Sequence, residues 1–525
     1  MKRTLFAFLT VIILFSLVAC AGGESGEEEG TSEQNESKKR LTVNLSADPV
    51  SLDPHAANDG TSLYVMNAMY DTLVAMNKEL EIEPALAESL EQVDELVWEA
   101  KLRKDVTFHD GSELNAEVVK ANLDRVRDPD VGSPLAFLFD MIDSVSVVDD
   151  FTVHIETKFP FAALPSHLAH PGGHIISLDA IEIDYQQMED GGDPFTYINE
   201  NPVGTGYFKY DERVNGEYVS LVKNDAYWGK RAKVDQVTFK TVPEDAARIA
   251  ELQTGEADII YPVNPNDMEQ INNNEETVVH ETESASMSYL GMNNNKEPFQ
   301  DSNVRQAIAM AIDKQELIDG VFSGVPLVAN GPLAPTVVGY SDSLEAIDYN
   351  LDKASELLKE AGYEEGFSAT ILAYDRTTSD VAEYIQVQLE KIGIDVNIEM
   401  AEVGAYLEVT ANGSFDMFIG SWGTVTLDAD YGLYPMFYSQ NAGSAGNRSF
   451  FNNERVDELL ENARQTSNEQ DRLQLYKEAQ QIIMDEATIV PLYHSVLLAG
   501  LREEVAGFYQ YPSSFPFLRD VAMNY

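Results

Sequence analysis

The sequence predicts an α/β protein with a sheet-rich α+β first half, and two observations lead to that fold class. Residues 368–400 combine an apolar stretch, an amphipathic helical segment and a strand-like alternation, in that order. The first half instead alternates short apolar segments with turn signals. Because a chain of 525 residues exceeds the usual size of one hydrophobic core, we expect at least two lobes.

The second half is expected to contain a βαβ unit because its segments follow two different periods. Val381, Ile385 and Leu389 fall on one face of a helix predicted over 379–392. From 394 to 400 every second residue is apolar, as in a strand with one buried face. Parallel strands need a crossover helix and helical cover, so this half should be α/β.

Two further segments of the second half predict buried helices. The apolar residues of 304–312 recur at helical spacing, directly after the capping residues Asp301 and Ser302. A second such face runs over 475–483. It is followed by the apolar run 489–493, which is typical of a buried strand.

The first half is expected to be rich in short strands. Asp110–Gly111 and Asn215–Gly216 are dipeptides typical of tight turns. Between these turns lie short alternating segments, for example Val145 and Val147 and then Val153 and Ile155. Turns that separate short alternating segments predict a mixed α+β lobe.

The composition is that of a soluble globular protein with a strongly acidic balance. Hydrophobic residues make up 44% and aromatic residues 10%, while 89 acidic against 35 basic residues give a formal net charge of −54. Nucleic-acid binding is excluded as a function class, because phosphate contacts need Lys and Arg. We interpret the acid excess as a solvated surface rather than a cation-collecting one.

The first forty residues predict an exported, lipid-anchored protein. An apolar run from Leu5 to Ala19 follows a charged start and is too short to span a membrane, so residues 1–19 predict a signal peptide. The run leads to Cys20, the single cysteine of the chain, in a context that resembles a bacterial lipobox. Residues 20–40 hold no aromatic and no large aliphatic side chain, which predicts a lipidated flexible linker.

No pattern of catalytic or cofactor-binding residues stands out. The sequence lacks a GxSxG elbow, a GxxxxGK[ST] phosphate loop, an HExxH helix and a CxxC pair. We therefore expect neither an enzyme nor a cofactor. His167, His170 and His174 are close enough in sequence to suggest a divalent metal. Because 171–173 interrupt them, an exposed loop is the simpler interpretation and no metal is predicted.

One segment of the second half combines aromatic rings with carboxylates. The rings are those of Trp422, Tyr431, Tyr434, Phe437 and Tyr438, and the carboxylates are those of Asp428 and Asp430. Rings supply contact area in a ligand pocket, while a few fixed charges orient the ligand. A buried core segment with acidic residues at the surface is the alternative interpretation.

Several ordered blocks resemble the extracellular solute-binding proteins of ABC importers for peptides, nickel and glutathione. These blocks are Ser51–His55, Asn67–Leu73, Trp98–Gly111, Pro202–Tyr207, Tyr227–Gly229, Arg248–Ile259 and Asn303–Lys314. Together they extend the resemblance over essentially the whole chain from Leu41 onward.

The resemblance implies a two-lobed periplasmic-binding-protein-like fold, in its type II, large cluster C form, with a ligand cleft between the lobes. Residues 41–288 and 496–525 would form lobe I, and residues 289–495 lobe II. The implied function is capture of a solute outside the cell and its delivery to the permease of an ABC importer. We expect a monomer without a nucleic-acid partner, held at the periplasmic or outer face of the cell membrane by the lipid on Cys20.

Within this family, the segment around Trp422 is most similar to the glutathione-binding branch, which has a tryptophan followed by a DAD sequence like that of 428–430. Peptide-binding branches carry an aspartate three residues after the tryptophan, and this chain has Val425 there. The ligand's ammonium would then pair with Asp428 or Asp430, because an enclosed charge needs a partner.

Arginines would bind the carboxylates of such a ligand, because a guanidinium engages a carboxylate with two hydrogen bonds. A surface or interlobe ion pair is the alternative for each arginine. The predicted ligand contacts are Trp422, Asp428, Asp430, Tyr431, Arg248, Arg376, Arg448, Tyr64, Tyr289 and Asn293. Glutathione or a short peptide is the expected ligand. A broad di- or oligopeptide receptor is the first alternative, and a receptor for nickel or a metal chelate is the second.

Overall fold

The computed structural model describes residues 39–57, 59–443 and 446–524. The predicted signal peptide, the predicted lipid attachment at Cys20 and nearly all of the linker 20–40 lie outside the described residues. Among the helices that are described, none is both long enough and apolar enough to cross a membrane.

The main sheet of the described residues has eleven strands. They are β1 (Arg40–Leu45), β8 (Phe208–Val214), β9 (Tyr218–Lys223), β10 (Gln236–Thr241), β11 (Ile259–Ile260), β12 (Thr277–Met292), β13 (Leu327–Val328), β14 (Phe367–Ala373), β15 (Ile394–Met400), β16 (Met417–Gly423) and β17 (Ile489–Arg502). Their order is β15-β14-β16-β12-β17-β11-β1-β10-β9-β8, with β13 beside β17. Parallel pairs occur in both halves of this order, at β1 with β10 and at β14 with β15.

Smaller sheets complete the β structure. A four-stranded sheet has the order β4 (Ala87–Asp94), β5 (Val97–Leu102), β7 (Thr152–Thr157) and β6 (Ile142–Asp149). Two-stranded pairs are formed by β2 (Val74–Met76) with β3 (Ile82–Pro84), β18 (Val505–Ala506) with β21 (Ala522–Met523), and β19 (Tyr509–Gln510) with β20 (Pro516–Phe517).

Fifteen α-helices of the described chain accompany the sheets. The first half carries α1 (Gly60–Met69), α2 (Ala116–Arg127), α3 (Leu164–Leu168), α4 (Leu178–Glu189), α5 (Thr196–Glu200), α6 (Asp245–Thr254) and α7 (Met268–Asn272). The second half carries α8 (Ser302–Ala311), α9 (Lys314–Phe322), α10 (Leu351–Glu360), α11 (Arg376–Glu390), α12 (Val403–Asn412), α13 (Ala429–Phe437), α14 (Glu454–Gln465) and α15 (Glu469–Asp485).

The predicted βαβ unit is confirmed as β14, α11 and β15, whose strands pair in parallel. The helix begins at Arg376 rather than at the predicted 379, because Asp375 and Thr378 form a capping box. The Asp375 carboxylate accepts a hydrogen bond from the Thr378 N–H at 2.8 Å. Beyond the helix, Gly393 adopts a left-handed conformation with φ of 86°, which lets the chain turn into β15.

The predicted α+β character of the first half is also confirmed. The four-stranded sheet is antiparallel throughout, and the alternating residues Val145, Val153 and Ile155 are buried against one core. Gly216 has φ of 76° and closes the turn between β8 and β9. Glycine is favoured there because a side chain disfavours positive φ.

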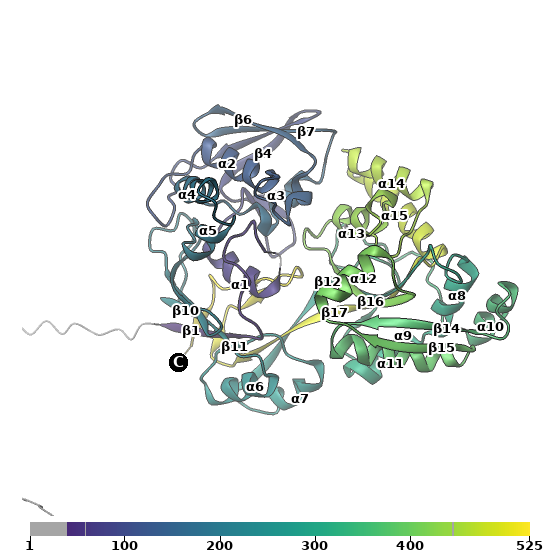
Figure 1. Ribbon diagram of the computed structural model, residues 1–525. Coiled ribbons are helices and arrows are strands. Elements are labelled where there is room, and N and C mark those ends of the chain that lie inside the picture. Colours follow the sequence, from purple (N-terminus) through teal and green to yellow (C-terminus); the bar gives the residue numbers. More distant parts are fainter. Residues whose placement is uncertain (1–38, 58, 444–445, 525) are drawn as a thin grey trace, which may run out of the picture. The chain divides into compact units, whose positions relative to one another are not determined.

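Two long strands connect the halves of the fold. Figure 1 shows β12 and β17 running between the elements of the first half and the group that holds α8–α15. The strands pair antiparallel, and the register shifts between Glu283 and Met287, so that residues 284–286 are passed over in the ladder. The expected lobe boundaries, 288/289 and 495/496, fall within this pair of strands. The boundaries themselves stay a proposal.

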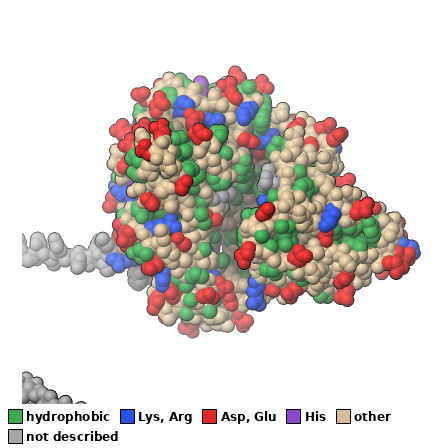
Figure 2. Space-filling model, viewed as in Figure 1, with side chains coloured by type: hydrophobic (Ala, Val, Ile, Leu, Met, Phe, Trp, Pro, Cys, Tyr) green, Lys and Arg blue, Asp and Glu red, His purple; other side chains and the backbone are tan. Residues whose placement is uncertain are grey.

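On the face of the molecule that Figure 2 shows, acidic side chains are spread out and do not form a single patch. Figure 2 shows them over the whole visible face, with basic side chains scattered between them. This distribution agrees with the interpretation of the charge as a property of the solvated surface.

Candidate ligand-binding site

A cavity of about 340 Å³ lies where several segments of the chain meet. Its walls are drawn from residues 67–85, 166–174, 425–427 and 511–519, together with three aromatic side chains of the first half. In the proposed division, 425–427 belongs to lobe II and the other walls to lobe I. The volume is at the lower end of the roughly 300–1,000 Å³ that is typical of small-molecule sites.

Asp71 is a carboxylate of the cavity wall that accepts hydrogen bonds from three side chains. Its Oδ2 accepts hydrogen bonds from Trp228 Nε1 at 2.9 Å and Thr205 Oγ1 at 2.8 Å, and its Oδ1 accepts one from the Tyr227 hydroxyl at 3.1 Å. Burial raises the pKa of Asp71, while these donors and the charge of Arg519 oppose the rise. The donors hold the carboxylate in one orientation at the edge of the cavity.

Four neutral polar groups of the wall have no hydrogen-bond partner among the described residues. They are Asn67 Nδ2, His170 Nε2, His174 Nδ1 and Thr426 Oγ1. Burial lowers the pKa of each histidine to about 3, so both rings are neutral at pH 7. Buried polar groups are normally paired, so these four indicate a wall that hydrogen-bonds a ligand.

Two cations stand beside aromatic rings at the same cavity. Lys78 Nζ lies 4.9 Å from the centroid of the Tyr509 ring, and Arg519 Cζ lies 4.6 Å from that of Phe517. Both cations belong to the cavity wall. Cation–π contacts orient these side chains without neutralising their charge.

Trp422 and Tyr431 pack against each other and do not belong to the cavity wall. The Trp422 indole N–H donates to the Tyr431 carbonyl at 3.0 Å, and the two ring centroids are 5.5 Å apart. Tyr431 is buried in the core of the first half, where its ring stacks on Phe137. The segment therefore lines the cavity at Val425–Leu427 and not through the two predicted aromatic contacts.

Asp428 is occupied by the protein itself. It caps α13 by accepting a hydrogen bond from the Asp430 N–H at 2.8 Å, and it forms an ion pair with Arg472. Asp428 is 4% exposed and does not belong to the cavity wall. The hypothesis that it receives the ligand's ammonium therefore has no support in the geometry.

Asp430 is likewise occupied. Its Oδ1 lies 3.0 Å from Arg464 Nε and accepts a hydrogen bond from Tyr476 at 3.2 Å, and its Oδ2 lies 3.4 Å from His167 Nε2. Burial raises the pKa of Asp430, but the charge of Arg464 and the proximity of His167 outweigh burial and lower it to about 2. This carboxylate joins α13 to α14 and α3 rather than facing the cavity.

Arg248 is buried within the first half. Its guanidinium donates to the carbonyls of Val242 at 2.9 Å and Pro262 at 3.1 Å, and it forms an ion pair with Asp245. These contacts hold α6 in place, and Arg248 is not part of the cavity wall. Arg248 is therefore not among the ligand contacts that we propose.

Arg376 and Arg448 belong to the second half and also lie outside the cavity wall. The Arg376 side chain is 92% exposed, with Asp380 at 3.7 Å. Arg448 is partly buried and donates to the Leu407 carbonyl at 2.8 Å and to the Thr410 hydroxyl. The alternative of an ordinary surface or structural contact fits both arginines.

The three weaker predicted contacts lie apart from the cavity. Tyr64 lines a separate crevice at the ends of β1 and β11, where its ring centroid is 5.1 Å from that of Tyr261. Tyr289 is buried in β12 against Phe418. Asn293 donates to two backbone carbonyls of the loop between α12 and β16, at 2.9 and 3.2 Å.

The histidines of the 167–174 segment do not converge. His167 Nδ1 contacts the Leu138 carbonyl at 2.8 Å, while His170 Nδ1 accepts a hydrogen bond from the Gly172 N–H at 2.9 Å. The described residues contain no group of three His, Cys, Asp or Glu side chains placed to hold a metal ion. The segment is buried, which corrects the expectation of an exposed loop.

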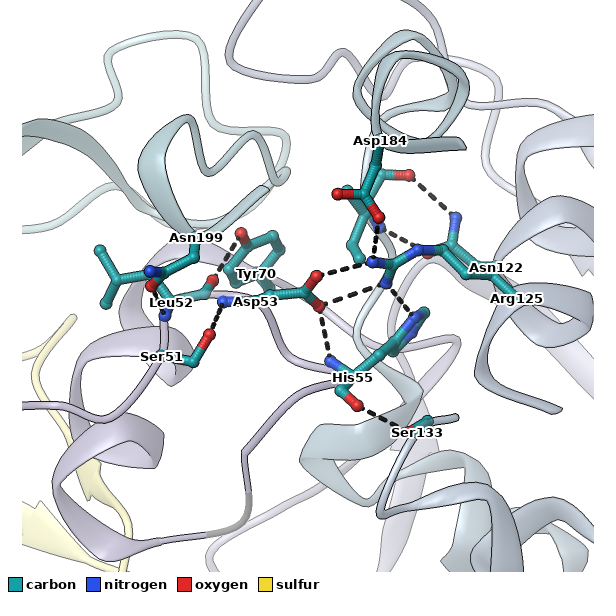
Figure 3. A network of polar contacts seen from close by, with 11 residues as sticks. Ser51, Leu52, Asp53, His55, Tyr70, Asn122, Arg125, Ser133, Asp184 and Asn199 are labelled. Carbon is teal, nitrogen blue, oxygen red and sulfur yellow. Dashed lines mark hydrogen bonds and ion pairs between the residues drawn. The ribbon is translucent and has the colours of Figure 1, made fainter. Parts of the chain in front are cut away.

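The Ser51–His55 block builds a buried ion network in the first half (Figure 3). Arg125 Nη2 donates to Asp53 at 2.8 Å and to Asp184 at 2.7 Å, and Arg125 Nη1 lies 2.9 Å from His55 Nδ1. None of these residues belongs to the cavity wall. The block therefore fixes the turn that leads into α1, whose far end carries the chain to Asp71.

Sequence reasoning missed Asp71, Asn67, Thr426 and Arg519 as site residues. A signal for Asp71 was present, because it lies in the Asn67–Leu73 block and its partners lie in the blocks Pro202–Tyr207 and Tyr227–Gly229. No comparable local signal marks Arg519, which reaches the cavity through the tertiary fold.

The fold is mixed α/β, its two halves are joined by the paired strands β12 and β17, and residues of both halves line the cavity. These features define a solute-binding protein of the periplasmic-binding-protein type. The sequence model of one protein family, the bacterial extracellular solute-binding proteins, family 5 (middle region), matches residues 81–444. The chain belongs to this family.

Individual relatives agree with this assignment. Glutathione-binding protein GsiB of Salmonella choleraesuis is 34% identical, over 91% of this chain and 93% of its own. GsiB of Pectobacterium atrosepticum is 35% identical, over 90% and 92%. The ABC transporter-associated periplasmic binding protein DppA of Helicobacter pylori, solved with the peptide STSA, superposes with a TM-score of 0.81 at 32% identity, over 93% of this chain and 99% of its own.

Proposed function

We propose that this protein is the solute-binding lipoprotein of an ABC importer and that it captures glutathione or a short peptide in the cavity described above. The observation that carries the proposal is a cavity of about 340 Å³ whose wall holds four unpaired neutral polar groups as well as charged ones. The names of the GsiB relatives and of DppA support the same class of ligand.

Capture would follow from the placement of the walls in two lobes. Residues 425–427 approach the cavity from the proposed lobe II, and Asn67, Asp71 and His170 approach it from lobe I. A ligand that touches both walls stabilises the closed arrangement relative to the open one. The permease would then recognise the closed form.

Calorimetry with reduced and oxidised glutathione and with di- and tripeptides tests this proposal. We expect one of these solutes to bind the purified protein and to raise its melting temperature, because a ligand that binds the folded state stabilises it. Val425→Trp should abolish that binding by filling the cavity, while Val387→Trp on the exposed face of α11 should not. If none of these solutes binds, the proposed function is wrong.

A broad oligopeptide receptor is the second candidate, favoured by the tetrapeptide in the DppA structure. The cavity volume favours a shorter ligand, because extended peptides add about 3.3–3.6 Å of length per residue. Tight binding of peptides of five or more residues would support the broad receptor instead.

The membrane anchor is a separate proposal, based on the sequence around Cys20. A lipid on this residue would hold a monomer near its permease. The mass of the mature protein, and its release from membranes in Cys20→Ala, test the anchor.

A further inference from the structure

Asp71 keeps acceptor capacity toward the cavity. Its Oδ2 accepts two hydrogen bonds, but its Oδ1 accepts one, from Tyr227. A carboxylate offers about four lone-pair sites. The free site on Oδ1 suits a cationic donor, because charge-assisted hydrogen bonds are the stronger kind. In contrast to Asp428 and Asp430, Asp71 forms no ion pair within the described chain and belongs to the cavity wall.

Arg519 retains free donors in the same wall. Its Nε has no hydrogen-bond partner in the described part of the chain, and the carboxylate nearest to it there, that of Asp520, is 3.9 Å away and already pairs with Lys230. The ring of Phe517 supports one face of the guanidinium. The guanidinium is thus held in place by the ring, and its N–H groups remain available to an anion.

Asp71 and Arg519 belong to the same cavity wall, and the described structure shows no ion pair between them. Although burial has the largest effect on the pKa of Asp71, the charge of Arg519 is near enough to act on it as well. An acceptor and a guanidinium of opposite charge in one cavity wall, not paired with each other, complement a ligand that carries an ammonium and a carboxylate on the same carbon.

We propose, on the basis of the function proposed above, that this pair binds an α-amino-acid head group, with the ammonium on Asp71 and the neighbouring carboxylate on Arg519. An ordinary peptide lacks this head group, because the carboxyl of its first residue is consumed in the peptide bond. A γ-glutamyl peptide keeps both charges on one carbon. The site therefore selects γ-glutamyl peptides, of which glutathione is one, over their α-linked isomers.

The neutral part of the wall suits the remainder of such a ligand. Asn67 and Thr426 can donate to amide carbonyls, and the uncharged rings of His170 and His174 can pair with amides without requiring a counter-charge. Lys78 is exposed at the cavity and can reach a second carboxylate at the far end of the ligand.

Calorimetry on the full-length mature chain with γ-Glu-Cys-Gly and with its isomer α-Glu-Cys-Gly tests this selection. We expect the γ-linked peptide to bind roughly tenfold or more tightly, because a charge-assisted contact is lost in the isomer. Equal affinity for the isomers overturns the inference and leaves the proposed function standing. If neither isomer nor any short peptide binds, both fail.

Two variants separate the roles of the charges. Arg519→Gln should reduce the preference for the γ-linked isomer to near unity, whereas Asp71→Asn should weaken both isomers, since both carry an ammonium. Arg376→Gln, at an exposed arginine outside the cavity, is the matched control and should change neither affinity. Unchanged selectivity in Arg519→Gln overturns the assignment.

Asp71 also stabilises the fold by accepting three hydrogen bonds, so the effect of Asp71→Asn on binding mixes with its effect on folding. A second measurement, on the unmodified protein, avoids this problem. Glutaryl-Cys-Gly, which lacks the ammonium, should bind the unmodified protein roughly tenfold or more weakly than γ-Glu-Cys-Gly. If the deaminated analogue binds equally well, the ammonium contact with Asp71 is wrong, whether or not Asp71→Asn folds.

Discussion

Arg125 is fully buried, and its guanidinium contacts the carboxylates of Asp53 and Asp184. Burial keeps the pKa of Asp53 above its ordinary value in spite of the charge of Arg125. One cation therefore compensates two carboxylates in a region without solvent. Loss of that cation leaves both carboxylates without a counter-charge, and a buried charge in this state is costly.

We expect Arg125→Met to lower the free energy of unfolding by about 3–5 kcal/mol at pH 7. Urea denaturation measures the change. The matched control is Arg455→Met, which removes an arginine that is 51% exposed in its pairs with Glu458 and Glu478. It should lower the free energy of unfolding far less, because exposed ion pairs contribute little. Similar losses in both variants would show that the buried network does not have this role.

The candidate site shows how far the sequence predicts the role of a single residue. The residue pattern singles out Asp428 and Asp430 as unusual carboxylates, and the structure places both at the base of α13. Their cations, Arg472 and Arg464, come from two other helices. A short motif shows that a carboxylate is present, but the tertiary fold decides whether it faces a ligand or an arginine.

At the scale of elements, the end of α1 and the segment of Gly206 pack backbone against backbone. The Gly206 N–H donates to the Met69 carbonyl at 2.9 Å, and a Cβ on Gly206 would lie 2.4 Å from the Met69 carbonyl carbon. The same contact brings Thr205 to the Asp71 carboxylate. The glycine is therefore needed for space, and the close approach positions one wall of the cavity.

Gly206→Ala should force these segments apart, lower the free energy of unfolding by about 1–3 kcal/mol and weaken ligand binding. Thermal or urea unfolding and calorimetry measure the two effects. Gly320→Ala is the control, because Gly320 lies in α9 with no atom within 4 Å of the added Cβ. That change should stabilise the helix slightly. A fully stable, ligand-binding Gly206→Ala would contradict the packing argument.

Elements with a strong local period are those that the sequence predicts. The βαβ unit is visible because its helix and strands have different spacings of apolar residues, and its helix differs from expectation mainly at the cap. The pairing of β12 with β17 joins residues more than two hundred positions apart, such as Thr277 and Arg502. No local pattern reports such a partner, so apolar periodicity alone does not predict this pairing.

At the scale of the whole molecule, buried neutral histidines couple stability to pH. Burial lowers the pKa of His109 and His494 to about 4, that of His170 and His174 to about 3, and that of His55 well below its usual value. The unfolded chain takes up protons near pH 6.5, where the folded state does not. Stability is thus fully present above that pH and is lost as the pH falls toward the folded-state values.

The melting temperature should accordingly fall between pH 7 and pH 5. Asp430 contributes nothing to this fall, because its pKa of about 2 places its loss of stability below pH 4. Scanning calorimetry across this range measures the slope. His170→Gln should reduce the slope by up to about 1.4 kcal/mol per pH unit. A melting temperature that stays constant or rises from pH 7 to pH 5 would contradict the argument.

The antiparallel pairing of β12 and β17 also determines the path of the chain between the two halves of the fold. The chain enters the second half along one strand and returns along its neighbour, so that Glu283 and Val496 face each other across the ladder. Everything between these two positions is, in topological terms, an insertion into a single hairpin. In this topology, a short turn that joined them would excise the insert and restore that hairpin.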